Sequence, residues 1–410
     1  MNRRMIICMV GRIVSLEALL LLLPLIVSVV YREGCLWAFA AAIAAALAVG
    51  GAMALLSRPS SQVIFAKEGF VIVAIAWVLM SAIGALPFTL SGEIPSYIDA
   101  LFETVSGFTT TGASILPDPG KLSRGLLFWR SFTHWIGGMG VLVLVMALVP
   151  SGSGRTMHIL RAEMPGPIVG KLVPRVRDTA KILYIIYLAM TVVEVILLLC
   201  GGMDLFHSLV YSFGTAGTGG FSVSSAGVGE YSPYIQWVIA VFMLLFGVNF
   251  NLYYLILVRR FRTALRSREL WVYGLIVLIA SAVVTGNILS LCESFGEAVR
   301  LAVFQVASII TTTGYATANF DLWPGLSKAV LLLLMFVGGC AGSTAGGLKV
   351  SRVQLLFAAV RRELQRLLHP RSVSAIRLDG KRVDETTING TTTYFALYAM
   401  LLAATFLAIC

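Results

Sequence analysis

Long apolar stretches recur along almost the whole sequence, and they constrain the fold more than any other feature. A helix needs about 20 predominantly apolar residues to cross a bilayer. Windows near or above that length occur at 13–31, 36–56, 69–90, 126–150, 182–202, 233–258, 270–291, 326–360 and 394–410. Only 12% of the 410 residues are charged, and the mean hydropathy is +0.89. These values exclude an ordinary soluble protein, so we predict an all-α, multi-pass membrane protein.

The first apolar window has some features of a signal peptide. Arg3 and Arg4 precede it. The apolar run is too long for a signal peptide, however, and no cleavage pattern of small residues follows it. We interpret it as a membrane helix that is kinked at Pro24.

The net charge of +11 is distributed unevenly between successive loops. Basic residues gather at the N-terminus and in segments 151–181, 259–268 and 349–382. Acidic residues gather in the loops 91–125, 203–232 and 292–325. Because Lys and Arg are retained on the cytoplasmic side, we place the basic segments inside and the acidic loops outside, where they raise the local concentration of cations. The basic runs lack interleaved aromatic residues, so we predict no nucleic-acid binding, although they could dock an acidic cytoplasmic partner.

A phrase rich in threonine and glycine occurs in each of the three acidic loops. The copies are Thr109–Ala113, Thr215–Phe221 and Thr311–Ala316. Each copy follows a short amphipathic stretch, at 96–107, 204–214 and 294–310, and lies between two apolar spans. The sequence therefore predicts three units of span, short helix, threonine–glycine strand and span, with Gly112, Gly219 and Gly314 at equivalent positions.

The predicted geometry indicates a chemistry. A helix of about three turns cannot cross a hydrocarbon core about 30 Å thick, but it can enter from outside and return as an extended strand. Irregular backbone at that depth is tolerated where it lines a water-filled cavity. Its carbonyl oxygens can replace part of the hydration shell of a cation. A single copy of the phrase could equally serve close helix packing, whereas three matching copies favour a pore.

We accordingly predict a cation-binding selectivity filter. Its residues are Thr110, Thr111, Gly112, Gly217, Thr218, Gly219, Thr312, Thr313 and Gly314. We predict no cofactor and no transition-metal site, since the six cysteines are scattered and none is paired with histidine at ligand spacing.

The last span of the third unit is interrupted by a glycine-rich segment. Gly338–Gly347 separates the apolar run 331–337 from a helix that we expect to resume at Leu348. Each glycine disfavours a helix by about 1 kcal/mol relative to alanine. The spacing to Lys349 does not match a phosphate-binding loop. We predict a flexible intramembrane segment below the filter, formed by Gly338, Gly339, Gly342, Ser343, Thr344, Gly346 and Gly347.

Together these residues resemble the Trk/Ktr/HKT superfamily, and most closely its TrkH-type bacterial potassium subunits. The resemblance rests on the three phrases, on His134–Gly140, on 338–349 and on the extra pair of spans before residue 60. It implies potassium uptake across the bacterial inner membrane, a homodimer with one pore per chain, and a cytoplasmic ring of nucleotide-binding, TrkA-like regulatory subunits. It also implies that the glycine-rich loop is the gate and that a glycine at position 112 favours potassium over sodium.

The expected organisation follows from the repeat and the resemblance. We predict an N-terminal helix pair at 1–60, pore repeats at 69–150, 182–260 and 270–362, cytoplasmic linkers at 151–181 and 363–393, and the first helix of a fourth repeat at 394–410. The resemblance implies a fourth filter segment, which we expect beyond Cys410. We therefore expect the 410 residues alone not to conduct selectively.

Other classes of protein fit the sequence less well. A sodium- and potassium-permeable symporter of the same superfamily stays open as an alternative. A secondary transporter for another solute would show inverted halves rather than repeats of one orientation. An enzyme would need a nucleophile with a base, or a metal pair, and the sequence contains neither His-Glu-x-x-His nor Gly-x-Ser-x-Gly. We predict that the chain is not an enzyme.

Overall fold

The computed structural model describes residues 2–57, 66–140, 176–369, 375–378 and 381–409. The regular secondary structure within these ranges is helical, apart from an antiparallel pair of two-residue strands, β1 (Arg377–Leu378) and β2 (Lys381–Arg382). Six of the described helices are long and apolar enough to cross a membrane, or seven if one bent pair counts as a span. The predicted all-α, multi-pass architecture is confirmed. The linker 151–181 falls mostly outside the described residues, as does the end of the window 126–150.

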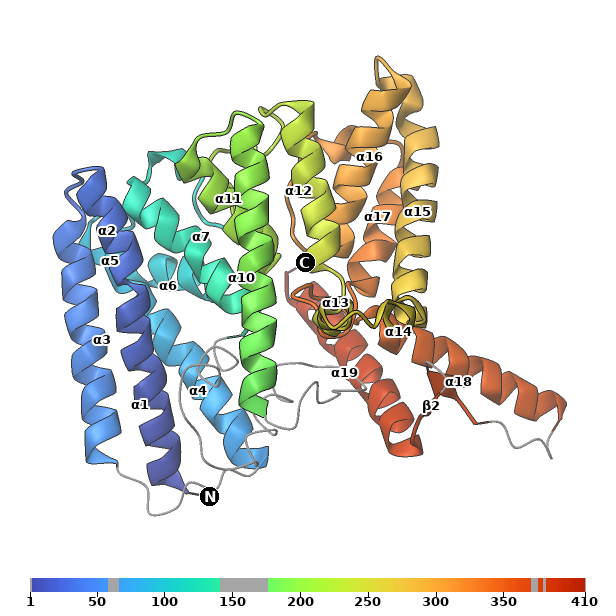
Figure 1. The fold of residues 1–410 in the computed structure, drawn as a ribbon, viewed down its shortest axis with the longest axis horizontal. Coiled ribbons are helices and arrows are strands. Elements are labelled where there is room, and N and C mark those ends of the chain that lie inside the picture. The colour runs from blue at the N-terminus through green and yellow to red at the C-terminus, as the bar shows by residue number, and fades with distance from the viewer. Residues whose placement is uncertain (1, 58–65, 141–175, 370–374, 379–380, 410) are drawn as a thin grey trace.

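The N-terminal helices form a hairpin at one end of the molecule (Figure 1). Helix α1 (Arg3–Leu20) continues after a break at Leu21 into α2 (Leu22–Val30), and α3 (Leu36–Leu56) returns alongside α1. The break precedes Pro24, which cannot donate the helical bond back to residue 20. Gly11 and Gly50 allow α1 and α3 to approach closely, because a Cβ on Gly11 would lie 2.7 Å from the Gly50 carbonyl oxygen.

The first repeat contains the elements that the sequence predicts. It comprises α4 (Ala66–Gly84), α5 (Leu86–Leu90), the short helix α6 (Tyr97–Phe108) and α7 (Arg124–Gly138). Ser96 caps α6 by accepting a hydrogen bond from the Asp99 N–H. The chain then returns through the first threonine–glycine phrase to α7, so α6 ends inside the molecule.

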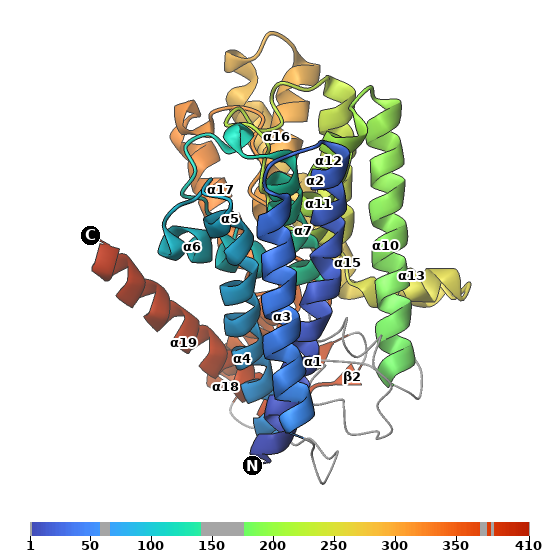
Figure 2. The ribbon, with the colours of Figure 1, turned by 90° about the vertical axis from the view of Figure 1, so that its left-hand side faces the viewer.

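The second repeat differs from the predicted one in its last helix. It comprises α10 (Val176–Cys200), the short helix α11 (Leu205–Gly217), α12 (Pro233–Phe246) and α13 (Phe250–Leu257). The expected continuous span 233–258 is wrong, because the axes of α12 and α13 meet at 92°. Helix α13 projects sideways from the body in Figure 2.

The bend between α12 and α13 has a clear local cause. Asn249 caps the new helix by accepting from the Asn251 N–H at 2.9 Å. The Gly247 carbonyl accepts from the Cys340 N–H instead, and the Phe250 N–H donates to the Gly342 carbonyl. The glycine-rich loop therefore takes up backbone groups that a straight helix would pair internally.

The third repeat carries the predicted interruption. It comprises α15 (Arg268–Ile288), the short helix α16 (Phe295–Ile310), α17 (Gly325–Val337) and α18 (Val350–Leu368). Helix α18 begins at Val350 rather than at Leu348. The short helix α14 (Phe261–Leu265) connects the second and third repeats.

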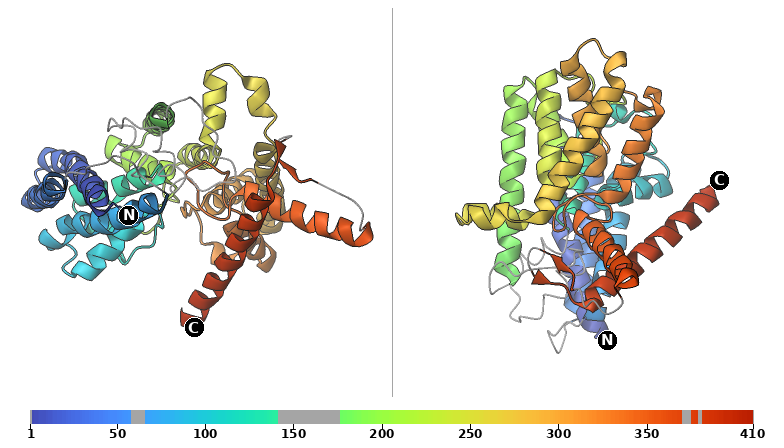
Figure 3. Two further views of the ribbon diagram at one scale, coloured as in Figure 1. Left: turned by 90° about the horizontal axis from the view of Figure 1, so that it is seen from below. Right: turned by 90° about the vertical axis from the view of Figure 1, so that its right-hand side faces the viewer.

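Helix α19 (Glu385–Ile409) is longer than the predicted window 394–410. It therefore contains an apolar span of 24 residues, which is long enough to cross a bilayer. Both α18 and α19 extend away from the helical body when the molecule is seen from below (Figure 3). They are joined by a salt bridge in which Arg362 Nη1 lies 2.6 Å from Glu385 Oε1. Arg362 is consequently engaged within the chain, unlike the exposed Arg361.

Candidate functional site

The three short helices α6, α11 and α16 end in the same backbone conformation. Thr110, Thr218 and Thr312 have left-handed φ values of 54°, 53° and 57°. Each of their amides donates to the carbonyl three residues earlier, and the next amide donates to the carbonyl five residues earlier. Threonine rarely adopts this conformation, so its threefold recurrence marks equivalent positions.

This conformation corrects the predicted register of the second repeat. Two residues after each left-handed threonine lies a glycine with positive φ, which is Gly112 (75°), Gly220 (76°) or Gly314 (89°). The counterpart of Gly112 and Gly314 is therefore Gly220, and not Gly219 as the sequence suggested. Gly219 instead corresponds to Thr111 and Thr313. The sequence was misleading because the triplet Gly217-Thr218-Gly219 offers a glycine on either side of the threonine.

The strands that follow the short helices lie against one another through these glycines. The carbonyl oxygen of Gly219 occupies the place that a Cβ on Gly112 would take. The carbonyl oxygen of Thr313 occupies the corresponding place on Gly220. Equivalent carbonyl oxygens of the second and third strands thus lie against the glycines of the first and second strands. Only glycine fits at these two positions. Such a cluster of backbone oxygens can coordinate a cation without any carboxylate.

Threonine hydroxyls pair within the first and third strands, and one histidine packs against the second. Thr109 and Thr111 are hydrogen-bonded through their hydroxyls at 2.8 Å, and Thr311 and Thr313 repeat this contact at 2.8 Å. The second repeat has Gly217 and Gly219 at these positions, with the backbone carbonyl of His134 against Gly217 and the His134 ring against Gly219. His134 is fully buried and stacks on Phe221 with a centroid distance of 4.0 Å. Its ring therefore packs between Phe221 and Gly219 and supports the strand of the second repeat.

A buried ion pair lies next to the first and second strands. Arg130 Nε lies 2.5 Å from Glu103 Oε1, and both side chains are almost completely buried. Glu103 also accepts from the Ser114 hydroxyl and the Ile115 N–H, while Arg130 donates to the Ser222 carbonyl at 3.1 Å. Buried charges need such complete pairing. This network, which the sequence analysis did not identify, fixes the chain just after each of two phrases.

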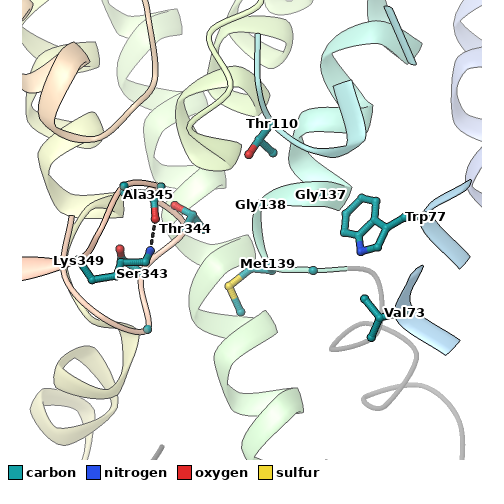
Figure 4. Close-up of a pocket in the computed structure, with 14 residues that line it drawn as sticks. Val73, Trp77, Thr110, Gly137, Gly138, Met139, Ser343, Thr344, Ala345 and Lys349 are labelled. Carbon is teal, nitrogen blue, oxygen red and sulfur yellow. Dashed lines mark hydrogen bonds between the residues drawn. The ribbon is translucent and has the colours of Figure 1, made fainter. Parts of the chain in front are cut away.

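The glycine-rich loop between α17 and α18 lies directly beneath the strands. The Thr218 hydroxyl donates to the Thr344 carbonyl at 3.0 Å, and the Gly346 N–H donates to the Thr312 hydroxyl at 2.8 Å. A cavity of about 330 Å³ separates part of the loop from α4 and from the end of α7. Figure 4 shows Thr110 above this cavity, Lys349 and Ala345 on one side, and Trp77 on the other.

Buried polar groups hold the loop in place. Glu269 Oε1, at the start of α15, accepts from the Ala341 N–H at 2.7 Å and from the Ser351 N–H at 3.1 Å. The ammonium group of Lys349 donates to the Ala345 carbonyl. The loop is therefore fastened at both ends and contacts two strands above. The loop is also hydrogen-bonded through its backbone to Gly247 and Phe250, and the Cys340 side chain lies in the apolar core.

The predicted loop residues all belong to this segment. Gly338, Gly342 and Gly347 have positive φ, Gly339 contacts Gly247, Ser343 donates to the Cys340 carbonyl, and Thr344 and Gly346 contact the strands. Their density explains the break, since a Cβ on Gly338 would overlap the Gly346 carbonyl oxygen. Across the described residues, no group of three His, Cys, Asp or Glu side chains could hold a metal ion.

Comparisons with known proteins identify the family of the chain. A family model described as TrkH, cation transport protein, matches residues 36–410. The Trk system potassium uptake protein TrkH of Escherichia coli K12 is 38% identical over 419 residues, covering 100% of this chain and 86% of that protein. The chain belongs to the TrkH family. Its relative in Halomonas elongata, another Trk system potassium uptake protein TrkH, is 34% identical over 98% of this chain and 84% of that protein.

A solved structure confirms the fold of this TrkH-family chain. The crystal structure of the potassium transporter TrkH from Vibrio parahaemolyticus superposes with a TM-score of 0.88 at 32% identity, covering 100% of this chain and 86% of that one. The resemblance predicted from the sequence is therefore confirmed, as is the repeated architecture around the short helices. The individual filter and gate residues stay predictions, which the following proposal uses.

Proposed function

We propose that this chain takes up potassium ions through a filter formed by the three threonine–glycine strands, and that the loop 338–347 gates it from below. The observation that carries the proposal is the contact between strands, in which the carbonyl oxygens of Gly219 and Thr313 lie over Gly112 and Gly220. Backbone carbonyl oxygens can replace the hydration shell of a monovalent cation. The relatives are named as a potassium uptake protein and a potassium transporter, which supports potassium as the ion.

The short helices support cation binding electrostatically. Each of α6, α11 and α16 directs its carboxyl end, with the negative end of its dipole, at the strands. No acidic side chain among the described residues is needed at the ion itself. The ion is therefore cargo, and this transport role requires no resident cofactor.

The loop suits a gate because of where it is fastened. It is hydrogen-bonded to Thr218 and Thr312, which are the residues where two of the short helices turn into filter strands. A conformational change that releases it must break these bonds and those to Glu269. Ion flow and loop position are then coupled through a few polar contacts.

The Trk system named by the relatives implies further subunits. We propose a homodimer and a cytoplasmic, TrkA-like ring of nucleotide-binding subunits as the form in which the chain works. The exposed basic residues of α18, including Arg361 and Arg366, support an acidic cytoplasmic partner.

Uptake of rubidium-86 tests the proposed function. The full-length protein, produced in cells that lack their own potassium uptake, should restore rubidium influx, and excess potassium should compete while sodium should not. Equal competition by sodium would favour the sodium- and potassium-permeable alternative. No influx from a correctly inserted protein would refute the proposal.

Shortening the loop tests the gate separately. Deletion of Gly342–Ala345 removes the contact with Thr218, so flux should rise while the preference for potassium is retained. An insertion-competent deletion variant that conducts no more than the parent would refute the gating role without affecting the filter.

A further inference from the structure

The carbonyl oxygen that follows each filter glycine needs a hydrogen-bond donor. In the first and third repeats, a serine on the same short helix provides it. The Ser106 hydroxyl donates to the Ala113 carbonyl at 2.6 Å, and the Ser308 hydroxyl donates to the Tyr315 carbonyl at 2.6 Å. Each serine lies four residues before the left-handed threonine of its repeat. These bonds tie each strand to its own helix.

The second repeat has no such serine. Gly214 stands four residues before Thr218, and the carbonyl that needs a donor belongs to Phe221. A buried carbonyl without a donor is costly. The missing hydroxyl is supplied from the third repeat instead, because Tyr315 Oη lies where a Cβ on Gly214 would be. Its single proton is shared in a bifurcated hydrogen bond between the Tyr211 carbonyl at 3.1 Å and the Phe221 carbonyl at 3.4 Å.

We propose that Tyr315 is a specificity-determining residue that links the second and third filter strands. Its own carbonyl is held by Ser308, and its hydroxyl holds the strand of Phe221, so two strands share one support. The proposal rests on the proposed potassium filter and adds a residue that sets its geometry.

The surroundings of Tyr315 leave little freedom for another arrangement. The side chain is 2% exposed, and its ring packs against Tyr211 with a centroid distance of 5.6 Å. Two side chains pack against the Phe221 ring. His134 stacks on it, and the guanidinium carbon of Arg130 lies 3.5 Å from the ring centroid. The side chain of Phe221 is thus clamped, and its carbonyl direction depends on the Tyr315 hydroxyl. A tilted carbonyl would alter the size of the ion site and weaken the discrimination between potassium and sodium.

A rescue experiment tests this link. The full-length protein is reconstituted in proteoliposomes, and reversal potentials with potassium and sodium on opposite sides give the permeability ratio. Tyr315→Phe removes only the hydroxyl, so the ratio should fall several-fold, on the order of the value of one hydrogen bond. Gly214→Ser alone should also impair selectivity, because its Cβ overlaps the hydroxyl of Tyr315.

The double variant Tyr315→Phe with Gly214→Ser should recover much of the wild-type ratio. It gives the second repeat the serine that the first and third repeats have, and it removes the overlapping hydroxyl. Tyr253→Phe is the matched control, because its hydroxyl donates to the Leu245 carbonyl outside the filter strands. The control should keep the wild-type ratio.

Each outcome decides the proposal. A folded Tyr315→Phe protein with the wild-type ratio overturns it, as does a double variant no better than the worse single variant. If Tyr315→Phe does not fold, recovery of a folded, selective double variant supports the link and failure of that variant overturns it. A wild-type protein that does not select potassium would instead contradict the proposed function itself.

Discussion

Replacing Glu269 by glutamine should increase potassium flux by releasing the loop. The Ala341 N–H of the loop and the Ser351 N–H at the start of α18 both donate to the same oxygen, Oε1, and Glu269 is only 7% exposed. Glutamine keeps the size and one acceptor oxygen of glutamate but not the charge. The contrast between them therefore isolates the charge that strengthens these two bonds.

The expected magnitude follows from the two contacts. A hydrogen bond to a charged group contributes about 1.5–3 kcal/mol and a neutral one about 0.5–1.5 kcal/mol. Over two bonds the substitution should remove about 1–3 kcal/mol from the conformation in which the loop is fastened. Since about 1.4 kcal/mol corresponds to tenfold, the open population should rise by about 5- to 100-fold while the fastened state predominates. Selectivity should not change, because Glu269 does not contact the filter strands.

Rubidium-86 flux in proteoliposomes measures this effect, with the potassium-to-sodium permeability ratio as a second readout. Glu293→Gln is the control, because it makes the same change of charge at an exposed position in the outer loop before α16. A folded Glu269→Gln protein whose flux stays within about twofold of the parent would refute the fastening role. The free-energy change behind a twofold effect is smaller than that of a single weak hydrogen bond.

Three further variants test the filter and the docking surface. Gly112→Ser should lower the potassium-to-sodium permeability ratio, because its Cβ would displace the Gly219 carbonyl, and an unchanged ratio in a folded protein would exclude Gly112 from the filter. Gly220→Ala should also lower the permeability ratio. Its control is Gly296→Ala, which should leave the ratio unchanged because Gly296 has open space around it and an ordinary φ. Equal effects of the two substitutions would contradict the corrected register. Neutralising Arg361 and Arg366 should weaken association with the cytoplasmic partner in pull-downs and make the remaining binding less sensitive to salt, and binding unaffected by either change would leave them as topology signals.

The sequence predicted the three short helices closely because their boundaries are set by local chemistry. Ser96, Asp204 and Ser294 cap them through hydrogen bonds to amides three residues later, and a cap of this kind is visible in sequence. The glycine-rich break was also predictable, since so many glycines cannot continue a helix.

Other features depend on contacts between distant segments and were not predictable. The bend after Phe246 exists because the loop near Cys340 takes its backbone partners. The role of Gly220 became clear only from its positive φ and from the Thr313 carbonyl against it. The pairing of Glu103 with Arg130 joins a short helix to the helix that follows the strand, and neither residue stands in a recognisable motif.

Anomalous scattering from rubidium in crystals of the protein tests the central claim most directly. Rubidium replaces potassium chemically and is located by its own signal. We predict a peak at the strands, within coordination distance of the carbonyl oxygens of Gly219 and Thr313, which sodium does not displace. Rubidium bound only at carboxylates, with no peak at these carbonyl oxygens in a protein that transports it, would contradict the account.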